Sequence, residues 1–315
     1  MHANLATSLV LAGLLCAPIM AQAHSAFDDA LAACARTTEA CDKASYDETL
    51  CDAARKALPD CDANTGSGGL CKIKLADIAP TQVAVGAHAA HCKAKAKFKK
   101  SKDKIQHYLL RSNHHLPVVI GPKNGADKRF YITDHHHLSY ALWYANEQGY
   151  TDVDTLYACI LTNLKADDSD DFWSYMVSHR LTWLDDENGQ AISPKTLETR
   201  AADLEDMADD PYRTWSRWVR DSCGYVKAGN DCVPASYPAG AAYFMEFLWA
   251  DYLQRNLPGE DDIGAMSDKQ IASTIEEAIA IAQAPQAFLE GLPGYNDGSV
   301  LKPKPVDITE GCEAD

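Results

Sequence analysis

The residues best suited to chemistry lie in one short stretch, where an aspartate and three consecutive histidines follow a β-favouring run that ends at Thr133. A helix-favouring run begins directly after them. A turn from strand to helix presents free backbone N–H groups and attracts phosphate and other anions. Imidazoles there can transfer protons near neutral pH or bind a metal ion. We therefore expect a phosphate-handling or metal site at Asp134, His135, His136 and His137. The alternative is a helix capped by the aspartate, with exposed histidines.

Two kinds of chemistry are open to this cluster. Successive side chains on a helix point about 100° apart, so three consecutive imidazoles cannot all meet at one ion, although two could do so at a bent turn. A divalent metal ion could then be held by Asp134, His135 and His137. Without a metal ion, one histidine would act as general acid or base while another holds a phosphate.

A run of lysines could guide anions toward this turn. Nine lysines and two aspartates lie between Cys71 and Lys104, a local balance of +7 in a chain whose net charge is −16. Such a patch can steer an anionic substrate, and Lys93, Lys95 and Lys97 are the candidates to approach the site. The alternative is a solvated helix face. Aromatic residues hardly interleave with these lysines, which argues against a stacking platform for single strands there.

Two charged residues farther along the chain are also candidates for substrate binding. Arg213 precedes Arg217 by one helical turn, and the two could form a phosphate fork, although a structural salt-bridge network is the favoured alternative. Glu246 lies in an apolar helical segment. If it is buried, it needs a partner such as a histidine or Arg213.

The amino terminus has the pattern of a secretory signal peptide. An apolar run from Leu5 to Met20 ends in Ala-Gln-Ala, so we expect residues 1–23 to be removed and the mature chain to begin at His24. No later segment approaches the length of a membrane-spanning helix. These features predict a periplasmic or secreted protein without membrane insertion.

The cysteines agree with export. Ten of the eleven follow the signal peptide, and an even number in an exported chain favours disulfides over metal thiolates. Two antiparallel helices within residues 24–62 would bring the outer and the inner cysteines of that segment together. The predicted pairs are Cys34–Cys61, Cys41–Cys51, Cys71–Cys92 and Cys223–Cys232.

Hydrophobic patterning predicts an α+β chain of several units. Strands at Leu116–Pro122 and Phe130–Thr133 should pair within a small mixed sheet, and a helix should follow from Leu138. Strands interleaved with helices indicate a mixed α/β domain, whereas the second half of the chain is mainly helical. The expected units are a signal peptide (1–23), a disulfide-linked helical hairpin (24–62), an α/β domain (71–165), a helical domain (166–290) and an extended tail (291–315).

Several blocks of the chain resemble the ParB-like nuclease family, an exported branch of the ParB/sulfiredoxin-like superfamily. The blocks are Pro80–Gly86, Pro117–Pro122, Tyr131–Leu138, Asp209–Arg213 and Glu246–Asp251. The resemblance covers about Lys72 to Leu253 and implies a ParB/sulfiredoxin-like domain. It also implies that the Asp-His-His-His turn contacts nucleotide phosphates, with Gln82 of the first block and a lysine after that block near the substrate.

The turn also departs from the family pattern. Relatives carry arginines or a Gly-Cys-His-Arg element there, whereas this chain has histidines and no cysteine, so thiol chemistry is not supported. We expect an exported phosphoesterase or nuclease that acts on a nucleotide or nucleic-acid phosphate through Asp134 to His137. The alternative is a non-catalytic periplasmic protein that binds an anion or a nucleotide. The Asp-His cluster favours the enzyme, while the acidic net charge and the turn without arginine favour the binding protein. The expected partner is a phosphate-containing small molecule or a nucleic acid.

Overall fold

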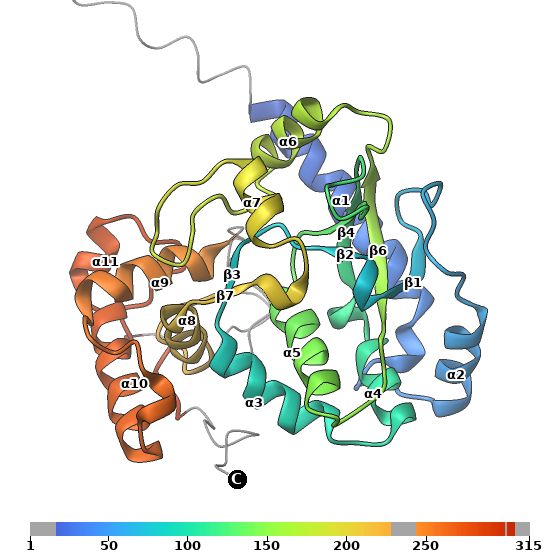
Figure 1. The fold of residues 1–315 in the computed structure, drawn as a ribbon. Coiled ribbons are helices and arrows are strands. Elements are labelled where there is room, and N and C mark those ends of the chain that lie inside the picture. Colours follow the sequence, from blue (N-terminus) through green and yellow to red (C-terminus); the bar gives the residue numbers. More distant parts are fainter. Residues whose placement is uncertain (1–16, 228–243, 300, 306–315) are drawn as a thin grey trace, which may run out of the picture.

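A five-stranded mixed sheet lies at the centre of an α+β fold (Figure 1). The computed structural model describes residues 17–227, 244–299 and 301–305. The strand order is β1-β6-β4-β5-β2. The strands are β1 (Leu70–Lys74), β2 (Ile78–Ala79), β4 (Leu116–Ile120), β5 (Phe130–Ile132) and β6 (Thr155–Asn163). β6 is the longest strand, and the residues from Leu156 to Leu161 are buried, as expected for a strand covered on both faces.

The pairing of β4 with β5 confirms the predicted strand pair of Leu116–Pro122 and Phe130–Thr133. The two strands are antiparallel, with Val118 opposite Ile132 and Val119 opposite Tyr131. The backbone N–H of Thr133 then donates to the Pro117 carbonyl at 2.9 Å. The sheet thus holds the chain up to the residue that precedes the Asp-His-His-His turn.

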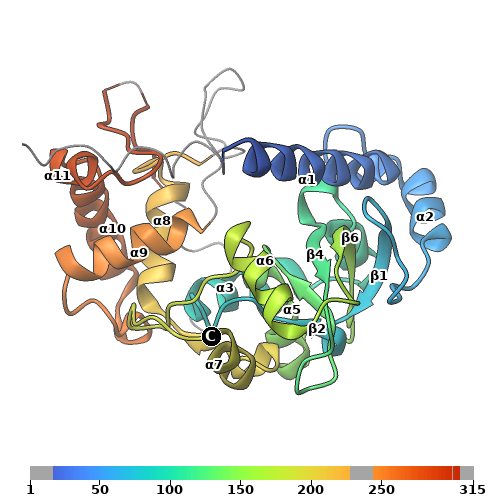
Figure 2. The same ribbon diagram turned by 90° about the horizontal axis from the view of Figure 1, so that it is seen from above.

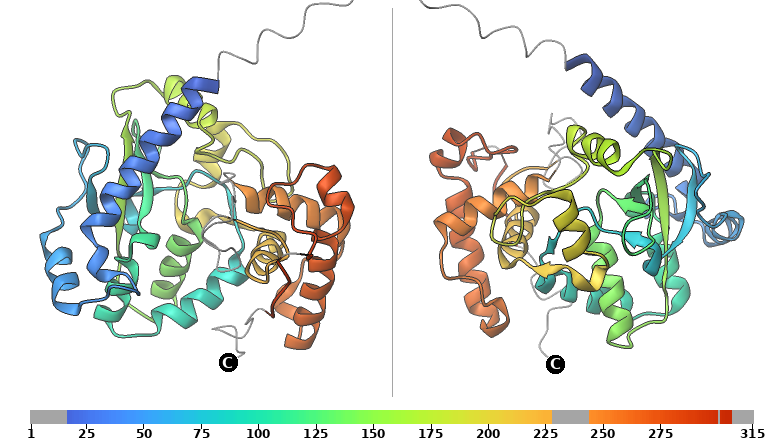
Figure 3. Two further views of the ribbon diagram at one scale, coloured as in Figure 1. Left: turned by 180° about the vertical axis from the view of Figure 1, so that it is seen from behind. Right: turned by 45° about the horizontal axis from the view of Figure 1, so that its top comes forward.

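Helices pack on this sheet and on one another. α1 (Ala17–Thr37) packs along β6, and Figure 3 shows it crossing the sheet in the view from behind. The next helices in the chain are α2 (Glu48–Ala57), α3 (Ala87–Phe98), α4 (Lys102–Leu109) and α5 (His136–Glu147). α3 buries small alanines, among them Ala90 and Ala94, which lets it lie close to α5.

A second, two-stranded sheet ties the start of α3 to the start of a helix far along the chain. β3 (Ala84–Val85) runs parallel to β7 (Ala208–Asp209). α8 (Pro211–Asp221) begins directly after β7, and its first N–H groups are capped by the carboxylate of Asp210. This small sheet brings α8 beside α3, at the centre of Figure 1.

The second half of the chain is mainly helical, as predicted. Its helices are α6 (Ser169–Ser178), α7 (Pro194–Arg200), α8, α9 (Met245–Asn256), α10 (Asp268–Ala282) and α11 (Pro285–Leu289). One hydrophobic core runs from Phe27 to Met207, and a second, from Tyr212 to Ala287, joins α8 to α11. Figure 2 shows this second group of helices beside the sheet domain. Among the described residues, no helix is long and apolar enough to cross a membrane.

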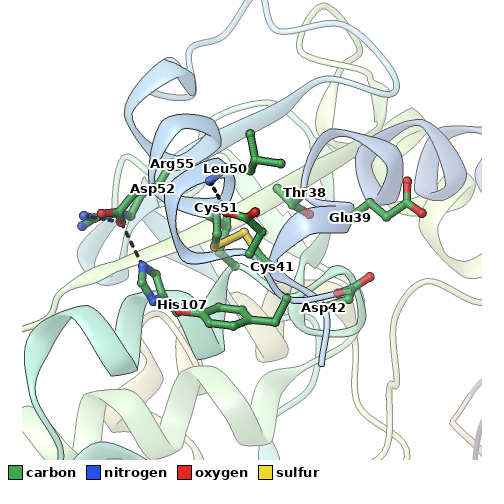
Figure 4. The surroundings of a disulfide bond; sticks show 12 residues. Thr38, Glu39, Cys41, Asp42, Leu50, Cys51, Asp52, Arg55 and His107 are labelled. Carbon is green, nitrogen blue, oxygen red and sulfur yellow. Dashed lines mark hydrogen bonds and ion pairs between the residues drawn. A yellow bond between two sulfur atoms is a disulfide. The ribbon is translucent and has the colours of Figure 1, made fainter. Parts of the chain in front are cut away.

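Three disulfides join described cysteines, and one of them was predicted. Cys41 pairs with Cys51 (Figure 4). The predicted pair Cys34–Cys61 is wrong, because α1 lies along the sheet and Cys34 meets Cys159 of β6. The predicted pair Cys71–Cys92 is also wrong, since Cys71 bonds to Cys61. Cys92 and Cys223 are disulfide-bonded too. Cys232, the predicted partner of Cys223, lies outside the described residues.

Candidate functional site

The Asp-His-His-His turn has a left-handed residue at its centre. His135 is the N-cap residue of α5 and has φ 64°. No side chain caps the helix, so the alternative interpretation of a helix capped by Asp134 is wrong. The Asp134 carboxylate instead accepts from the backbone N–H of its neighbour His135 at 2.6 Å. The Asp134 side chain is exposed and the His135 side chain is half-buried, so both can be reached from solvent.

His136 is part of the protein core. Its side chain is 3% exposed, and its Nε2 accepts from the backbone N–H of Thr81 at 3.1 Å. A nitrogen that accepts such a bond carries no proton, so the neutral ring holds its hydrogen on Nδ1. Burial lowers the pKa of His136 to about 3. His136 therefore holds the turn in place against the Thr81 segment.

His137 is held in the same tautomer but is half-buried. Its Nε2 accepts from the backbone N–H of Gly86 at 3.1 Å, which leaves an N–H donor at Nδ1. Burial lowers its pKa well below the ordinary value, and the charges of Arg213, Arg217 and Lys93 lower it further. At neutral pH His137 is therefore a hydrogen-bond donor and not a cation.

The two accessible residues influence each other. Burial lowers the pKa of His135, the carboxylate of Asp134 raises it, and the charges of Lys93 and Lys227 lower it again. For Asp134, partial desolvation by the surrounding protein raises the pKa, but the interactions with His135 and Lys227 outweigh this and the net shift is downward. At pH 7 the pair is thus a neutral imidazole beside an ionised carboxylate, which suits a general base.

A basic cluster faces the turn from other elements. It consists of Lys93 on α3, Arg213, Arg217 and Arg220 on α8, and Lys227 after α8. Burial holds the pKa of Lys93 well below its usual range, and the charges of Arg217 and Arg220 add to the effect. Cations held this close to one another stabilise a bound anion.

Carboxylates balance part of this charge. The buried Glu246 of α9 accepts from Arg220 Nη1 at 2.6 Å and from Lys227 Nζ at 2.7 Å. Glu246 therefore has the ionic partners that its burial requires, and they are not histidines. Arg217 pairs with Asp221 at 3.5 Å, so this arginine belongs to a salt bridge and not to a fork with Arg213.

Arg213 is the exception in the basic cluster. Its side chain is 5% exposed, and its Nε and Nη1 have no hydrogen-bond partner among the described residues. The guanidinium lies 3.9 Å from the ring centre of Phe247. Buried donors in native proteins are normally satisfied, so the two unpartnered guanidinium nitrogens beside the histidine turn indicate a place for an anion or a water molecule.

The structure does not bring every predicted residue to this place. Gln82 is buried, and its side-chain amide donates to the Ala84 carbonyl at 2.7 Å. The charge of Lys95 lowers the pKa of His88 and His91, which lie on the same helix and not at the turn. The charge of Lys97 lowers the pKa of Lys93. Lys93 is thus the lysine of the run whose charge acts directly on His135 and His137.

The predicted metal ligands are not gathered either. Within the part of the chain that the structure describes, no three His, Cys, Asp or Glu side chains form a group that could hold a metal ion. The set Asp134, His135 and His137 fails because His137 turns its Nε2 toward the Gly86 N–H. The geometry supports the metal-free arrangement of donors and a base.

Two basic residues of the site were missed from the sequence. Arg217 and Arg220 follow Arg213 at positions i+4 and i+7, a spacing that places all three on one face of a helix, so this signal was present. Lys227 carried no local signal. It belongs to the cluster because its Nζ donates to Glu246 at the start of α9.

The comparisons with known proteins identify the family. Residues 71–255 match the family described as "Putative ParB-like nuclease". The chain belongs to this family. The match contains the histidine turn and the whole basic cluster, and it begins after the stapled amino-terminal helices.

A solved structure has a similar fold. Protein Atu1540 from Agrobacterium tumefaciens is 29% identical to this chain, with a TM-score of 0.52. The alignment covers 72% of this chain and 97% of that protein. None of the curated proteins compared with the chain matches it.

Proposed function

We propose that this ParB-like protein is an exported phosphodiesterase of the nuclease type. Its site would bind a phosphate between the Asp134–His137 turn and the basic cluster. The family match supports a nuclease-like function at the coarse level. The finer assignment is supported by one observation: the Nδ1–H donor of His137 is near Arg213 of α8, whose charge lowers the pKa of His137 and whose Nε and Nη1 have no partner among the described residues.

The residues divide the reaction between them. A water molecule attacks phosphorus, its oxygen forms the new P–O bond, and the neutral imidazole of His135 takes its proton. The Nδ1–H of His137 and the N–H groups of Arg213 donate to the phosphoryl oxygens, where negative charge increases. The old P–O bond breaks, and the leaving alcohol takes a proton, which the imidazolium of His135 can return. Asp134 orients His135 and stabilises its charged form.

Export is the second part of the proposal. The Leu5–Met20 run and the Ala-Gln-Ala ending support cleavage after Ala23. All eight described cysteines after that point are disulfide-bonded, which is typical of proteins from oxidising compartments. Protein recovered from a secreting host should have an intact mass that begins at His24. A product that keeps Met1 would contradict export.

Turnover of phosphodiesters tests the proposed enzyme activity directly. The oxidised protein would be assayed on bis(p-nitrophenyl) phosphate, single-stranded DNA, duplex DNA and RNA, with and without an added divalent metal ion. We expect His135→Ala and His137→Asn each to lower turnover by about 100-fold. Lys104→Ala, a change in the lysine run away from the turn, should leave turnover unchanged and is the matched control.

The alternative function has its own result. If no phosphate ester is hydrolysed but nucleotides bind, and His137→Asn weakens that binding, the protein is a binding protein that uses the same site. If His135→Ala and His137→Asn change neither turnover nor binding, the turn is not the site and both assignments fail.

A further inference from the structure

Three aromatic side chains form a shelf beside the histidine turn. The rings of Trp183 and Phe247 stack at 4.9 Å with an interplanar angle of 24°. Phe244 lies against both, with its ring centre 5.8 Å from that of Trp183. Phe247 is buried, whereas Trp183 and Phe244 are only half-buried. The aromatic shelf, defined as Trp183, Phe244 and Phe247, therefore keeps ring surface open to solvent.

The aromatic shelf is joined to the site by short contacts. The backbone N–H of Trp183 donates to the Thr81 carbonyl at 3.0 Å. The N–H of the same Thr81 donates to His136. On the other side, the guanidinium of Arg213 covers the Phe247 ring at 3.9 Å. Arg213 and Trp183 thus both contact Phe247, so a ligand whose anionic part binds Arg213 would have the aromatic shelf as its neighbour.

The backbone at the edge of the shelf is strained. Phe244 has φ 54°, a left-handed conformation that is a true outlier for a bulky side chain. It is the N-cap residue of α9, as the left-handed His135 is of α5. Such strain is found most often at ligand sites and switch regions.

From this juxtaposition we propose that the aromatic shelf is a nucleobase subsite. A base would stack on Trp183 and Phe244 while the attached phosphate meets Arg213, Lys93 and the histidine turn. Every base has a flat π-face, so stacking binds bases without strong sequence preference. A base must leave the duplex to stack in this way, and the ligand is therefore a nucleotide or a single strand with unpaired bases. This inference rests on the proposed anion site.

Calorimetric titration can separate the contribution of the base to binding affinity from that of the phosphate. The oxidised full chain would be titrated with adenosine 5′-monophosphate, ribose 5-phosphate and inorganic phosphate. The first two ligands carry the same phosphate and sugar, and only the first carries a base. We expect the monophosphate to bind about tenfold more tightly than ribose 5-phosphate, the size of one stacking interaction. Trp183→Leu should remove that tenfold preference and leave ribose 5-phosphate binding unchanged.

Trp143→Leu is the matched control, because Trp143 is also half-buried but packs against Tyr140 in α5. It should keep the full preference for the base. Equal affinity of the unmutated chain for the two sugar phosphates would overturn the base subsite and leave the anion site intact. Unchanged nucleotide affinity in folded Trp183→Leu would overturn it as well. If neither sugar phosphate nor inorganic phosphate binds, the anion site itself fails.

Discussion

Three consecutive histidines occupy three different environments in this protein. His136 faces the core and is held by Thr81, His137 is held by Gly86, and His135 is half-buried at the helix start. The left-handed backbone at His135 bends the turn, and each following side chain then points about 100° away from the last. Since two of the rings accept backbone N–H groups, neighbouring residues have distinct surroundings: His136 positions the turn, His137 keeps an N–H donor at Nδ1, and His135 is the general base of the proposed reaction.

A residue-scale prediction concerns His136 and pH. A buried histidine with a pKa of about 3 stabilises the fold above its unfolded pKa of about 6.5, and this contribution is lost as the pH falls below that value. His136→Gln keeps an acceptor for the Thr81 N–H but does not titrate. Between pH 7 and pH 5, the free energy of unfolding measured with urea should therefore fall less steeply in His136→Gln than in the unmutated chain. The slopes should differ by up to about one proton, or about 1.4 kcal/mol per pH unit.

His136→Ala is the contrasting variant. It leaves the buried Thr81 N–H without an acceptor, so it should cost about 1–3 kcal/mol of unfolding free energy at pH 7 beyond any effect of His136→Gln. Equal acid slopes in the unmutated chain and His136→Gln would show that the ring of His136 is not kept neutral by the fold.

At the scale of elements, the site depends on the close approach of α3 and α8. The parallel pair β3 and β7 places the two helix starts side by side, and Asp209 of β7 accepts from the backbone N–H of Ala87 at 2.8 Å. Gly86 lies at the closest point. A Cβ there would lie 2.8 Å from both the backbone nitrogen and Oγ1 of Thr214. Only a glycine allows α8 to carry Arg213 to the histidine turn.

The element-scale prediction is that Gly86→Ala separates the two helices. The backbone of α8 must shift, so we expect a loss of about 1–3 kcal/mol in unfolding free energy. The bond from the Gly86 N–H to His137 should weaken with it, so phosphate affinity should fall as well. Gly125→Ala is the matched control, because nothing lies within 4 Å of its Cβ. Equal stability of the two variants in urea titrations would refute the close-approach explanation.

At the scale of the whole molecule, the disulfides hold together parts that are distant in sequence. Cys34–Cys159 links α1 to β6 across 125 residues, whereas Cys61–Cys71 spans 10. The Cys41–Cys51 loop is held further by His107 of α4, whose Nε2 lies 2.9 Å from the Asp52 carboxylate (Figure 4) and whose Nδ1 lies 2.8 Å from the Tyr46 hydroxyl. The amino-terminal helices are therefore joined covalently to the ParB-like domain and pack against it.

The whole-molecule prediction compares two disulfides by loop length. A longer closed loop removes more entropy from the unfolded chain. Cys34→Ala/Cys159→Ala should therefore lose about 2 kcal/mol more unfolding free energy than Cys61→Ala/Cys71→Ala. Urea unfolding of the two double variants, each with its remaining disulfides intact, measures the difference. A larger loss in the short-loop variant would rule out loop closure as the main source of stability.

The amino-acid sequence by itself determined the local features of this protein. The β4–β5 pair, the helix that follows it and the Cys41–Cys51 link depend on neighbouring residues and on periodicity, and they were predicted from the chain. The parallel pair β3 and β7 was not predicted, because its two strands lie more than a hundred positions apart in the chain.

Tertiary structure decided what depends on residues far apart in the chain. The Cys34–Cys159 link, the arrival of Arg213 and Lys227 at the turn, and the division of the three histidines all arise from contacts across at least fifty positions. A histidine has the same intrinsic chemistry at each of the three positions. Its protonation state and role are set by which backbone N–H groups and charges the fold brings to its ring, and these come from distant segments.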